Sequence, residues 1–311
     1  MKGSGSVAAI DCGTNSTRLL IVDRAGVTRV REMHVTRLGE GVDASRELSV
    51  PAMDRTLRVL KQFRATMDGE SVARARLVAT SAVRDALNGN EFLRAASRIT
   101  GARAELLSGV EEGRLSYSGA TMGLETVHSG TLVVDIGGGS TELIFGRIDQ
   151  IHSISTELGC VRLTERYLAH DPPENGEIAS VVEKIGTELD RVISRAPSLR
   201  RIRSDTRLIG LAGTVSTLVA LELGLVEYQR ELVHHATLTE QCVTHWCKLL
   251  SRESSAERAQ RSGMSEGRQD VIVGGALVLR EVMEIFQISE CLVSESDILD
   301  GLILTMRQGT G

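Results

Sequence analysis

The chain has 311 residues, which is enough for two domains of ordinary size, each with its own hydrophobic core. Hydrophobic residues make up 41% and charged residues 25%, and this composition excludes disordered, collagen-like and mucin-like proteins. The formal net charge of −5 provides no global positive field, so we expect neither a nucleic acid nor a membrane as a partner. Any polyanionic ligand must therefore be held by a local site.

The cysteines and the lengths of the apolar segments indicate in which cellular compartment the protein works. The five cysteines are scattered and include no Cys-x-x-Cys pair, which argues against a disulfide framework and a zinc ribbon. The longest apolar stretch, 271–279, is too short for a membrane span, and the N-terminal apolar run 7–10 is too short for a signal peptide. We therefore expect a cytoplasmic protein.

The first part of the chain predicts strands that alternate with helices. Apolar runs at 7–10 and 18–22 flank a turn of small polar residues, which is typical of a β-hairpin. The pattern then predicts a strand at 27–36, a helix at 51–67, a strand at 77–79, a helix at 91–100, a strand at 104–107 and a helix at 110–120. This alternation favours a layered α/β fold.

The opening pattern returns in the second part of the chain. An apolar strand at 131–136 carries an Asp at its end, and a glycine-rich turn and a second strand follow, as they do after Asp11. This internal repeat predicts a first domain at 1–125 and a second at 126–311, with a terminal helix that could pack back on the first domain. The second part further predicts a hairpin to 156, helices at 160–167 and 178–193, a strand at 207–211, and helices at 215–223, 269–286 and 302–306.

Three loops share one chemical design. In each, a strand runs into small residues whose backbone N–H groups and hydroxyls can approach an anion closely. Two of these loops begin with Asp11 and Asp135, and Mg²⁺ prefers a few carboxylates together with water and phosphate oxygens. The sequence therefore predicts two phosphate clamps that face each other across a cleft, with both Asp residues near a divalent metal. The predicted phosphate-binding residues are Gly13, Thr14, Asn15, Ser16, Gly137, Gly138, Gly139, Ser140, Thr141, Gly213 and Thr214.

Two further segments carry candidate chemistry. Ser81 and Arg84 follow the strand at 77–79 and offer a hydroxyl and a forked donor. Ser108 and Glu111 have the spacing of a capping box at the start of a helix, which gives Glu111 a structural role. Glu112 is left without such a role, so it is the better candidate for chemistry.

Taken together, these motifs resemble the Ppx/GppA family of exopolyphosphatases and guanosine pentaphosphate phosphohydrolases. The resemblance extends over essentially the whole chain and rests on the segments 11–18, 80–84, 108–115, 135–142, 157–160 and 213–214. It implies two ribonuclease-H-like domains of the actin/Hsp70/sugar-kinase superfamily with the active site in the cleft between them, and it suggests a homodimer.

The resemblance also implies roles for individual residues. Glu112 would be the catalytic base, and Asp11 and Asp135 would lie around the metal and its waters. Further residues at the phosphates would be Gly137 to Ser140, Arg18, Arg84, Glu142 and Arg268.

The chain departs from the family pattern near its end. Longer relatives append a helical HD-type domain that this chain lacks. Leu299 stands where relatives commonly have an Arg, and Glu295 stands in place of an Asp, so no basic contact can be carried over to that segment. We therefore expect a short form of the family.

The function expected from the sequence is a Mg²⁺-dependent exopolyphosphatase that removes terminal phosphate from linear, short-chain inorganic polyphosphate. Glu112 would activate the attacking water, and backbone N–H groups, Arg84 and the metal would hold the charge. One alternative is hydrolysis of the 5′-terminal phosphate of guanosine pentaphosphate (pppGpp), and a second is a non-catalytic polyphosphate or nucleotide sensor or an actin-like assembly protein. The surroundings of Glu112 argue against a third, an ATP-dependent small-molecule kinase.

Overall fold

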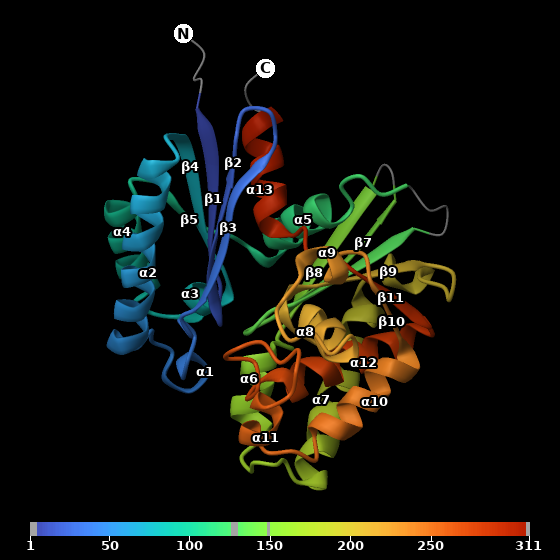
Figure 1. Cartoon of the computed structure of the whole chain (residues 1–311). Coiled ribbons are helices and arrows are strands. Elements are labelled where there is room, and N and C mark those ends of the chain that lie inside the picture. The colour runs from blue at the N-terminus through green and yellow to red at the C-terminus, as the bar shows by residue number, and fades with distance from the viewer. Residues whose placement is uncertain (1–4, 126–129, 148–149, 309–311) are drawn as a thin grey trace. The chain divides into compact units, whose positions relative to one another are not determined.

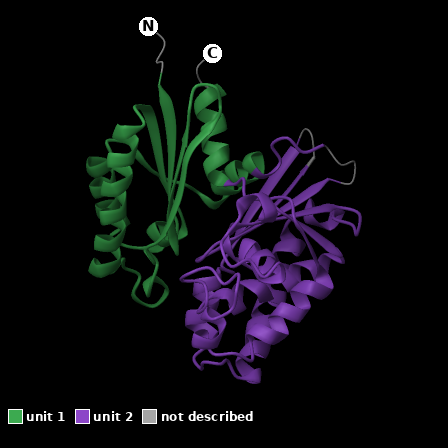
Figure 2. Cartoon of the chain, viewed as in Figure 1, with its two compact units in different colours: residues 1–119, 298–311 green, residues 120–297 purple. Residues whose placement is uncertain are grey.

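The chain divides into two compact units in the computed structural model (Figure 1), which describes residues 5–125, 130–147 and 150–308. Unit 1 takes residues 1–119 together with 298–311, and unit 2 takes residues 120–297 (Figure 2). The division lies a few residues before the sequence-based boundary at 125, next to residues 126–129, which lie outside the described ranges. The segment from 298 onward belongs to unit 1.

Unit 1 is built on a five-stranded sheet in the order β3-β2-β1-β4-β5. The central strand β1 pairs antiparallel with β2 and parallel with β4. The strands are β1 (Ser6–Cys12), β2 (Ser16–Val22), β3 (Thr28–Val35), β4 (Val72–Ala79) and β5 (Ala104–Leu106). The helices are α1 (Val42–Ser45), α2 (Val50–Gly69), α3 (Ser81–Asp85), α4 (Gly89–Thr100), α5 (Gly109–Ala120) and α13 (Ile298–Gln308).

Helices cover both faces of the unit 1 sheet. Figure 1 shows α2 and α4 on one face and α13 with α5 on the other. Two buried apolar clusters fill these layers: one contains Leu60, Phe63 and Phe92 under α2 and α4, and the other contains Leu299 and Leu302 under α13. The alternation of apolar residues along β1 supplies both clusters, because successive side chains of a strand point to opposite faces.

Unit 2 is built on a six-stranded sheet in the order β10-β11-β9-β6-β7-β8. Its strands are β6 (Thr131–Ile136), β7 (Thr141–Arg147), β8 (Gln150–Thr156), β9 (Arg207–Leu211), β10 (Thr237–Thr239) and β11 (Glu290–Val293). Its helices are α6 (Cys160–Tyr167), α7 (Asn175–Arg195), the 3₁₀ turn η1 (Leu199–Arg201), α8 (Ala212–Glu222), α9 (Arg230–Val233), α10 (Glu240–Leu250), α11 (Ser255–Ala259) and α12 (Ile272–Phe286). The largely apolar α12 is the centre of the core and packs against α6, α7, α8 and α10.

The internal repeat is present in three dimensions. The order β3-β2-β1-β4-β5 in unit 1 matches β8-β7-β6-β9-β11 in unit 2, with the same parallel and antiparallel pairings around β1 and β6. The expected α/β class with two ribonuclease-H-like units is therefore confirmed. Corresponding loops follow corresponding strands, so the loop after β1 has its counterpart after β6.

Several elements differ from those predicted. The predicted helix at 269–286 begins only at Ile272, and the residues before it form a turn in which the amide of Val271 donates to the carbonyl of Arg268. The strands β10 and β11 and the helices α9 and α11 were not predicted, since each has only three to five residues. Among the helices that the structure describes, none is long and apolar enough to cross a membrane.

Candidate active site

The hairpin at the start of unit 1 places Asp11 opposite Arg18. The two residues are direct partners in the register of β1 and β2, and Nε and Nη2 of Arg18 donate to Oδ2 of Asp11 over 3.1 and 2.7 Å. Asp11 is buried, with 3% of its surface exposed. The forked contact balances the negative charge of Asp11 within the hairpin itself.

The loop after β1 is held from two sides. The amide of Gly13 donates to the Ser16 carbonyl over 3.0 Å, which closes the turn. The hydroxyls of Thr14 and Ser81 lie 2.9 Å apart in a buried hydrogen bond, so the structure brings together two segments that the sequence identified separately. Asn15 is also buried, and its Nδ2 atom has no hydrogen-bond partner within the described residues. Buried donors are normally paired, so this amide suits a ligand oxygen.

A segment that the sequence analysis missed supports this loop. The amide of Gly39 donates to the Thr14 carbonyl, and the amides of Thr36 and Arg37 both donate to the Asn15 carbonyl. A Cβ atom on Gly39 would lie 2.3 Å from the Thr14 side chain, so the close approach requires glycine. The only sequence signal was a glycine shortly after a predicted strand.

Helix α5 separates the two adjacent carboxylates. Glu111 forms the predicted capping box: its Oε2 accepts from the amide and the hydroxyl of Ser108, at 3.0 and 2.8 Å, and its own amide donates back to the Ser108 hydroxyl. These bonds lower the pKa of Glu111. The side chain of Glu112 lies next to Arg84 instead: it is 9% exposed, and its Oε2 is 3.5 Å from Nη1 of Arg84. The same Nη1 donates to the Leu107 carbonyl over 2.8 Å, which fixes Arg84 beside Glu112.

The corresponding hairpin of unit 2 pairs two carboxylates. Asp135 and Glu142 are direct partners in the register of β6 and β7. Glu142 is buried, and its Oε1 accepts a hydrogen bond of 2.7 Å from the Ser155 hydroxyl. Side chains at such positions lie close on one face of the sheet, and like charges there favour a bound cation.

The glycine loop after β6 turns its carbonyls toward α6. The carbonyls of Gly137 and Gly138 accept from the amides of Cys160 and Val161, both over 2.9 Å, and the Gly139 carbonyl accepts from Nε of the buried Arg162 over 2.8 Å. The amides of Gly138 and Gly139, by contrast, make no hydrogen bond within the described residues. The loop therefore offers two adjacent N–H donors, the arrangement that binds anionic oxygens.

Gly159, which precedes α6, and Arg162 in its first turn allow the helix to pack against this loop. A Cβ atom on Gly159 would lie 2.1 Å from the Gly138 carbonyl oxygen, so only glycine lets α6 start against the loop. Arg162 was missed by the sequence analysis. An arginine near the start of a short amphipathic helix was the available signal, and its role became visible only with its contact to Gly139.

The third of the predicted loops, which follows β9 in unit 2, packs an arginine against its glycine. A Cβ atom on Gly213 would lie 2.1 Å from Nη2 of Arg268, which is itself 7% exposed, so the guanidinium lies directly over the start of α8. Thr214 packs against Gly275 of α12 and lies beside the thiol of Cys160. Burial raises the pKa of that thiol, which argues against Cys160 as a nucleophile.

Leu299 and Glu295, the two residues at which the chain departs from the family pattern, lie in different surroundings. Leu299 is buried, with 1% of its surface exposed, in the apolar cluster under α13, so an arginine would not fit this packing. The amide of Glu295 donates to Nδ1 of His234 over 3.1 Å.

Comparisons with known proteins all find members of one family. The model of the Ppx/GppA phosphatase family matches residues 20–309. Exopolyphosphatase 2 of Mycobacterium tuberculosis is 38% identical over 316 residues, which cover 96% of this chain and 98% of that protein. Among solved structures, the Ppx/GppA family member of Aquifex aeolicus is 31% identical with a TM-score of 0.80, and an exopolyphosphatase of Cytophaga hutchinsonii is 27% identical with a TM-score of 0.87; each comparison covers 98% of both chains.

Proposed function

Since the chain belongs to the Ppx/GppA phosphatase family, we propose that it is an exopolyphosphatase, which hydrolyses the terminal phosphate of linear inorganic polyphosphate. Similarity over nearly the full length of a protein named exopolyphosphatase supports this assignment. The observation that carries the proposal is the glycine loop 137–139, whose carbonyls are occupied by α6 while the amides of Gly138 and Gly139 stay available for phosphate oxygens.

Glu112 is the base in this proposal. Its neighbour Glu111 is occupied by the capping box, whereas the Glu112 carboxylate lies beside Arg84. The water oxygen forms a bond to the terminal phosphorus while the bond from that phosphorus to the bridging oxygen breaks. The water proton passes to the Glu112 carboxylate, and the shortened chain leaves with the electron pair. Arg84, held by the Leu107 carbonyl, keeps Glu112 oriented and adds positive charge near the phosphates.

The remaining loops bind the substrate in this proposal. Asn15 contributes its unpartnered Nδ2 donor, and Arg268 contributes its guanidinium over Gly213. Charge-assisted hydrogen bonds of this kind are about twice as strong as neutral ones. Phosphoryl transfer depends mainly on such positioning and charge stabilisation rather than on covalent assistance.

The donor set fits Mg²⁺. The described residues contain no group of three or more His, Cys, Asp and Glu side chains that could hold an ion by themselves. Mg²⁺ commonly takes one or two carboxylates and completes its shell with water and phosphate oxygens, so the cross-strand pair of Asp135 and Glu142 suits it. We assign Asp135, with Glu142 opposite it, to the ion and Asp11 to the water around it, and the ion would neutralise charge on the phosphates.

The cellular setting is part of the same proposal. The five cysteines are free thiols, and four of them are buried, which fits the reducing cytoplasm. We also retain the homodimer that the family resemblance implies. Size-exclusion chromatography with light scattering tests the oligomeric state.

Phosphate release tests the proposed activity. The enzyme is incubated with polyphosphate, with pppGpp, and with ATP plus candidate acceptors, each with and without Mg²⁺. We expect phosphate release from polyphosphate that requires Mg²⁺. Faster release from pppGpp would make the protein a guanosine pentaphosphate phosphohydrolase, and binding of polyphosphate without any release would make it a sensor.

A further inference from the structure

A buried arginine in α11 holds three segments of unit 2 together. Arg258 is 3% exposed, and its three guanidinium nitrogens each donate to a different partner. Nε donates to the Glu253 carbonyl over 3.1 Å, Nη1 to the Gln269 carbonyl over 2.6 Å, and Nη2 to Oδ1 of Asp171 over 2.8 Å. A forked cation with five N–H donors is the side chain best suited to such a junction.

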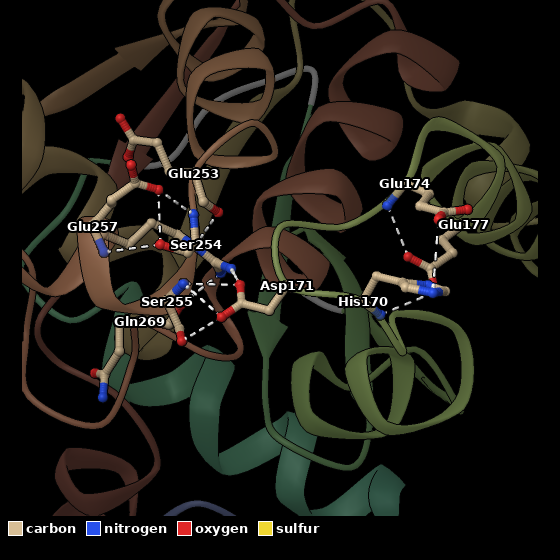
Figure 3. Close-up of polar contacts among 10 residues, drawn as sticks. His170, Asp171, Glu174, Glu177, Glu253, Ser254, Ser255, Glu257 and Gln269 are labelled. Atoms are coloured by element: carbon tan, nitrogen blue, oxygen red, sulfur yellow. Dashed lines mark hydrogen bonds and ion pairs between the residues drawn. The ribbon is translucent and has the colours of Figure 1, made fainter.

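Asp171 anchors one side of this junction. It belongs to the connection between α6 and α7, and it also caps α11: its carboxylate oxygens accept from the Ser255 amide over 2.8 and 2.9 Å and from the Ser255 hydroxyl over 2.6 Å (Figure 3). These contacts lower the pKa of Asp171, so it remains charged near neutral pH. The ion pair with Arg258 therefore ties α11 to the segment that follows α6.

Gln269 connects the other side of the junction to the candidate active site. Its carbonyl takes the short bond from Arg258, and its chain neighbour is Arg268, whose guanidinium lies over Gly213. The Arg268 carbonyl in turn starts α12 by accepting from the amide of Ile272 over 2.9 Å. The turn 268–271 is thus held by Arg258 on one side and by α12 on the other.

Arg258 is buried although burial of a cation is unfavourable, which indicates that its position between three hydrogen-bond partners serves the geometry of this junction. Burial lowers the pKa of its guanidinium, and Asp171 opposes that effect. Its partner Asp171 is 45% exposed, so the ion pair itself is weak evidence for stability: water screens the carboxylate, and the desolvation of Arg258 offsets much of the attraction. Arg261, on the turn that follows α11, provides the contrast: its guanidinium pairs with the Glu253 carboxylate and lies over the ring of Trp246, and within the described residues it donates no hydrogen bond to Gln269.

We propose that Arg258 is a positioning residue for Arg268: by holding the Gln269 carbonyl, it keeps the Arg268 guanidinium over the Gly213 loop, where it meets a substrate phosphate. This inference rests on the proposed function, because that function makes Arg268 a phosphate ligand. Arg258 itself does not touch substrate.

A double-mutant cycle with Arg258→Met and Arg268→Gln tests the proposal. Methionine fills the volume of the arginine stem without the charge. For Arg268→Gln we expect a rise in KM for polyphosphate of about 10- to 100-fold and a decrease of about 1 in the salt slope of binding, as for one lost phosphate contact. For Arg258→Met we also expect a higher KM for polyphosphate and a smaller salt slope of binding. The double variant should match Arg268→Gln within about twofold, because residues that act through one contact are not additive.

Two further variants separate positioning from general loosening. Arg261→Met removes a neighbouring cation without reaching Gln269, and we expect it to leave KM and the salt slope unchanged. Arg258→Lys retains the charge beside Asp171 but lacks the fork, and we expect a partial rescue of KM. Thermal melting of every variant shows that the proteins compared are folded.

The outcomes are distinct. Effects of Arg258→Met and Arg268→Gln that multiply in the double variant, an unchanged salt slope in Arg258→Met, or equal effects of Arg258→Met and Arg261→Met would each overturn the proposal. An unchanged KM in Arg268→Gln would overturn it as well, while leaving the exopolyphosphatase activity intact. Calorimetric binding of tripolyphosphate runs the same cycle without turnover, so a wild-type protein that binds but does not hydrolyse would refute only the proposed function.

Discussion

The two strand-end hairpins share a backbone and differ in charge. In unit 1, Asp11 faces Arg18 across the hairpin and is neutralised by it, whereas in unit 2, Asp135 faces Glu142. The order and pairing of five strands are the same in both units, and unit 2 adds β10 at one edge. The two hairpins therefore share their backbone pairing and differ in the residue opposite the Asp.

This difference separates two kinds of binding. An Asp balanced by a forked arginine leaves a loop whose remaining donors suit phosphate oxygens, and two carboxylates on one face suit a cation. The supports of the loops differ as well: unit 1 uses the segment 36–39, and unit 2 uses the start of α6. We infer that the hairpin of unit 2 carries the larger share of the metal dependence.

The largest expected effect separates the two Asp residues. Asp135→Ala should lower phosphate release by at least about 10³-fold, since a bound cation contributes several kcal/mol to the transition state. Asp11→Ala should cause a smaller loss and a smaller change in Mg²⁺ dependence, because Arg18 already balances Asp11. Rates measured over a Mg²⁺ series, with EDTA as the control, test this. Activity that persists in EDTA would remove the metal from the mechanism, and equal losses would remove the difference between the hairpins.

The next effect concerns the base in unit 1. Glu112→Gln should keep KM and lower kcat by roughly 10²- to 10⁴-fold, because the amide preserves shape but cannot accept the proton. Glu111→Gln is the matched control: it should weaken the capping box, by about 1 kcal/mol of stability, and leave kcat nearly unchanged. Steady-state kinetics and thermal melting measure both variants. A Glu112→Gln enzyme with near wild-type kcat would place the base elsewhere, with Glu111 as the next candidate.

Chain length should show how far the phosphate contacts extend. With a net charge of −5, and with Leu299 in the core rather than a cation at that position, we expect contacts to end near the strand-end loops. The value of kcat/KM should therefore level off at short polyphosphate chains, with a salt slope that reflects only a few contacts. Measurement across chains of increasing length tests this. A value that keeps rising to hundreds of units would require a basic track outside these loops.

A pair of glycine variants compares the loop supports. Gly159→Ala places a Cβ atom 2.1 Å from backbone, whereas Gly39→Ala places one 2.3 Å from the side chain of Thr14, which can adjust more easily. We expect Gly159→Ala to cost about 1–3 kcal/mol in the free energy of unfolding and to raise KM, and Gly39→Ala to cost less. Chemical denaturation and kinetics measure both. A larger cost for Gly39→Ala would reverse the ranking of the two supports.

The smallest effect concerns acid stability and compares the capping boxes of the two units. In unit 2, Glu177 accepts from the Glu174 amide over 2.8 Å and from His170, and these bonds lower the pKa of Glu177 to about 2 (Figure 3). The contribution of the Glu177 carboxylate to folding stability is therefore fully present above the ordinary pKa of a glutamate, and it is lost as the pH falls toward 2. Glu177→Gln should lower the melting temperature slightly at pH 7, and the difference from wild type should vanish by about pH 2. A difference that stays constant with pH would show that the charge of Glu177 contributes nothing.

Much of the fold and part of the site could be predicted from the sequence. Local patterns determined the β1 and β6 hairpins, the amphipathic α2 and α7, the internal repeat and the capping box of Glu111, because each depends on residues within one or two turns of each other. The short elements of the region 224–268 and the strand β11 were missed, since their conformation is set by packing on a sheet rather than by a local period.

The sequence by itself determined which residues stand at the strand ends: an Asp followed by small residues after β1 and β6, and Gly213 with Thr214 after β9. Only the tertiary structure decided their partners. It directed Arg18 to Asp11, brought Gly39 beneath Thr14, turned the carbonyls of Gly137 to Gly139 toward α6, and laid Arg268 over Gly213. The physical reason is that close approaches and hydrogen bonds between segments far apart in the chain depend on how sheets and helices pack, and no local propensity encodes them.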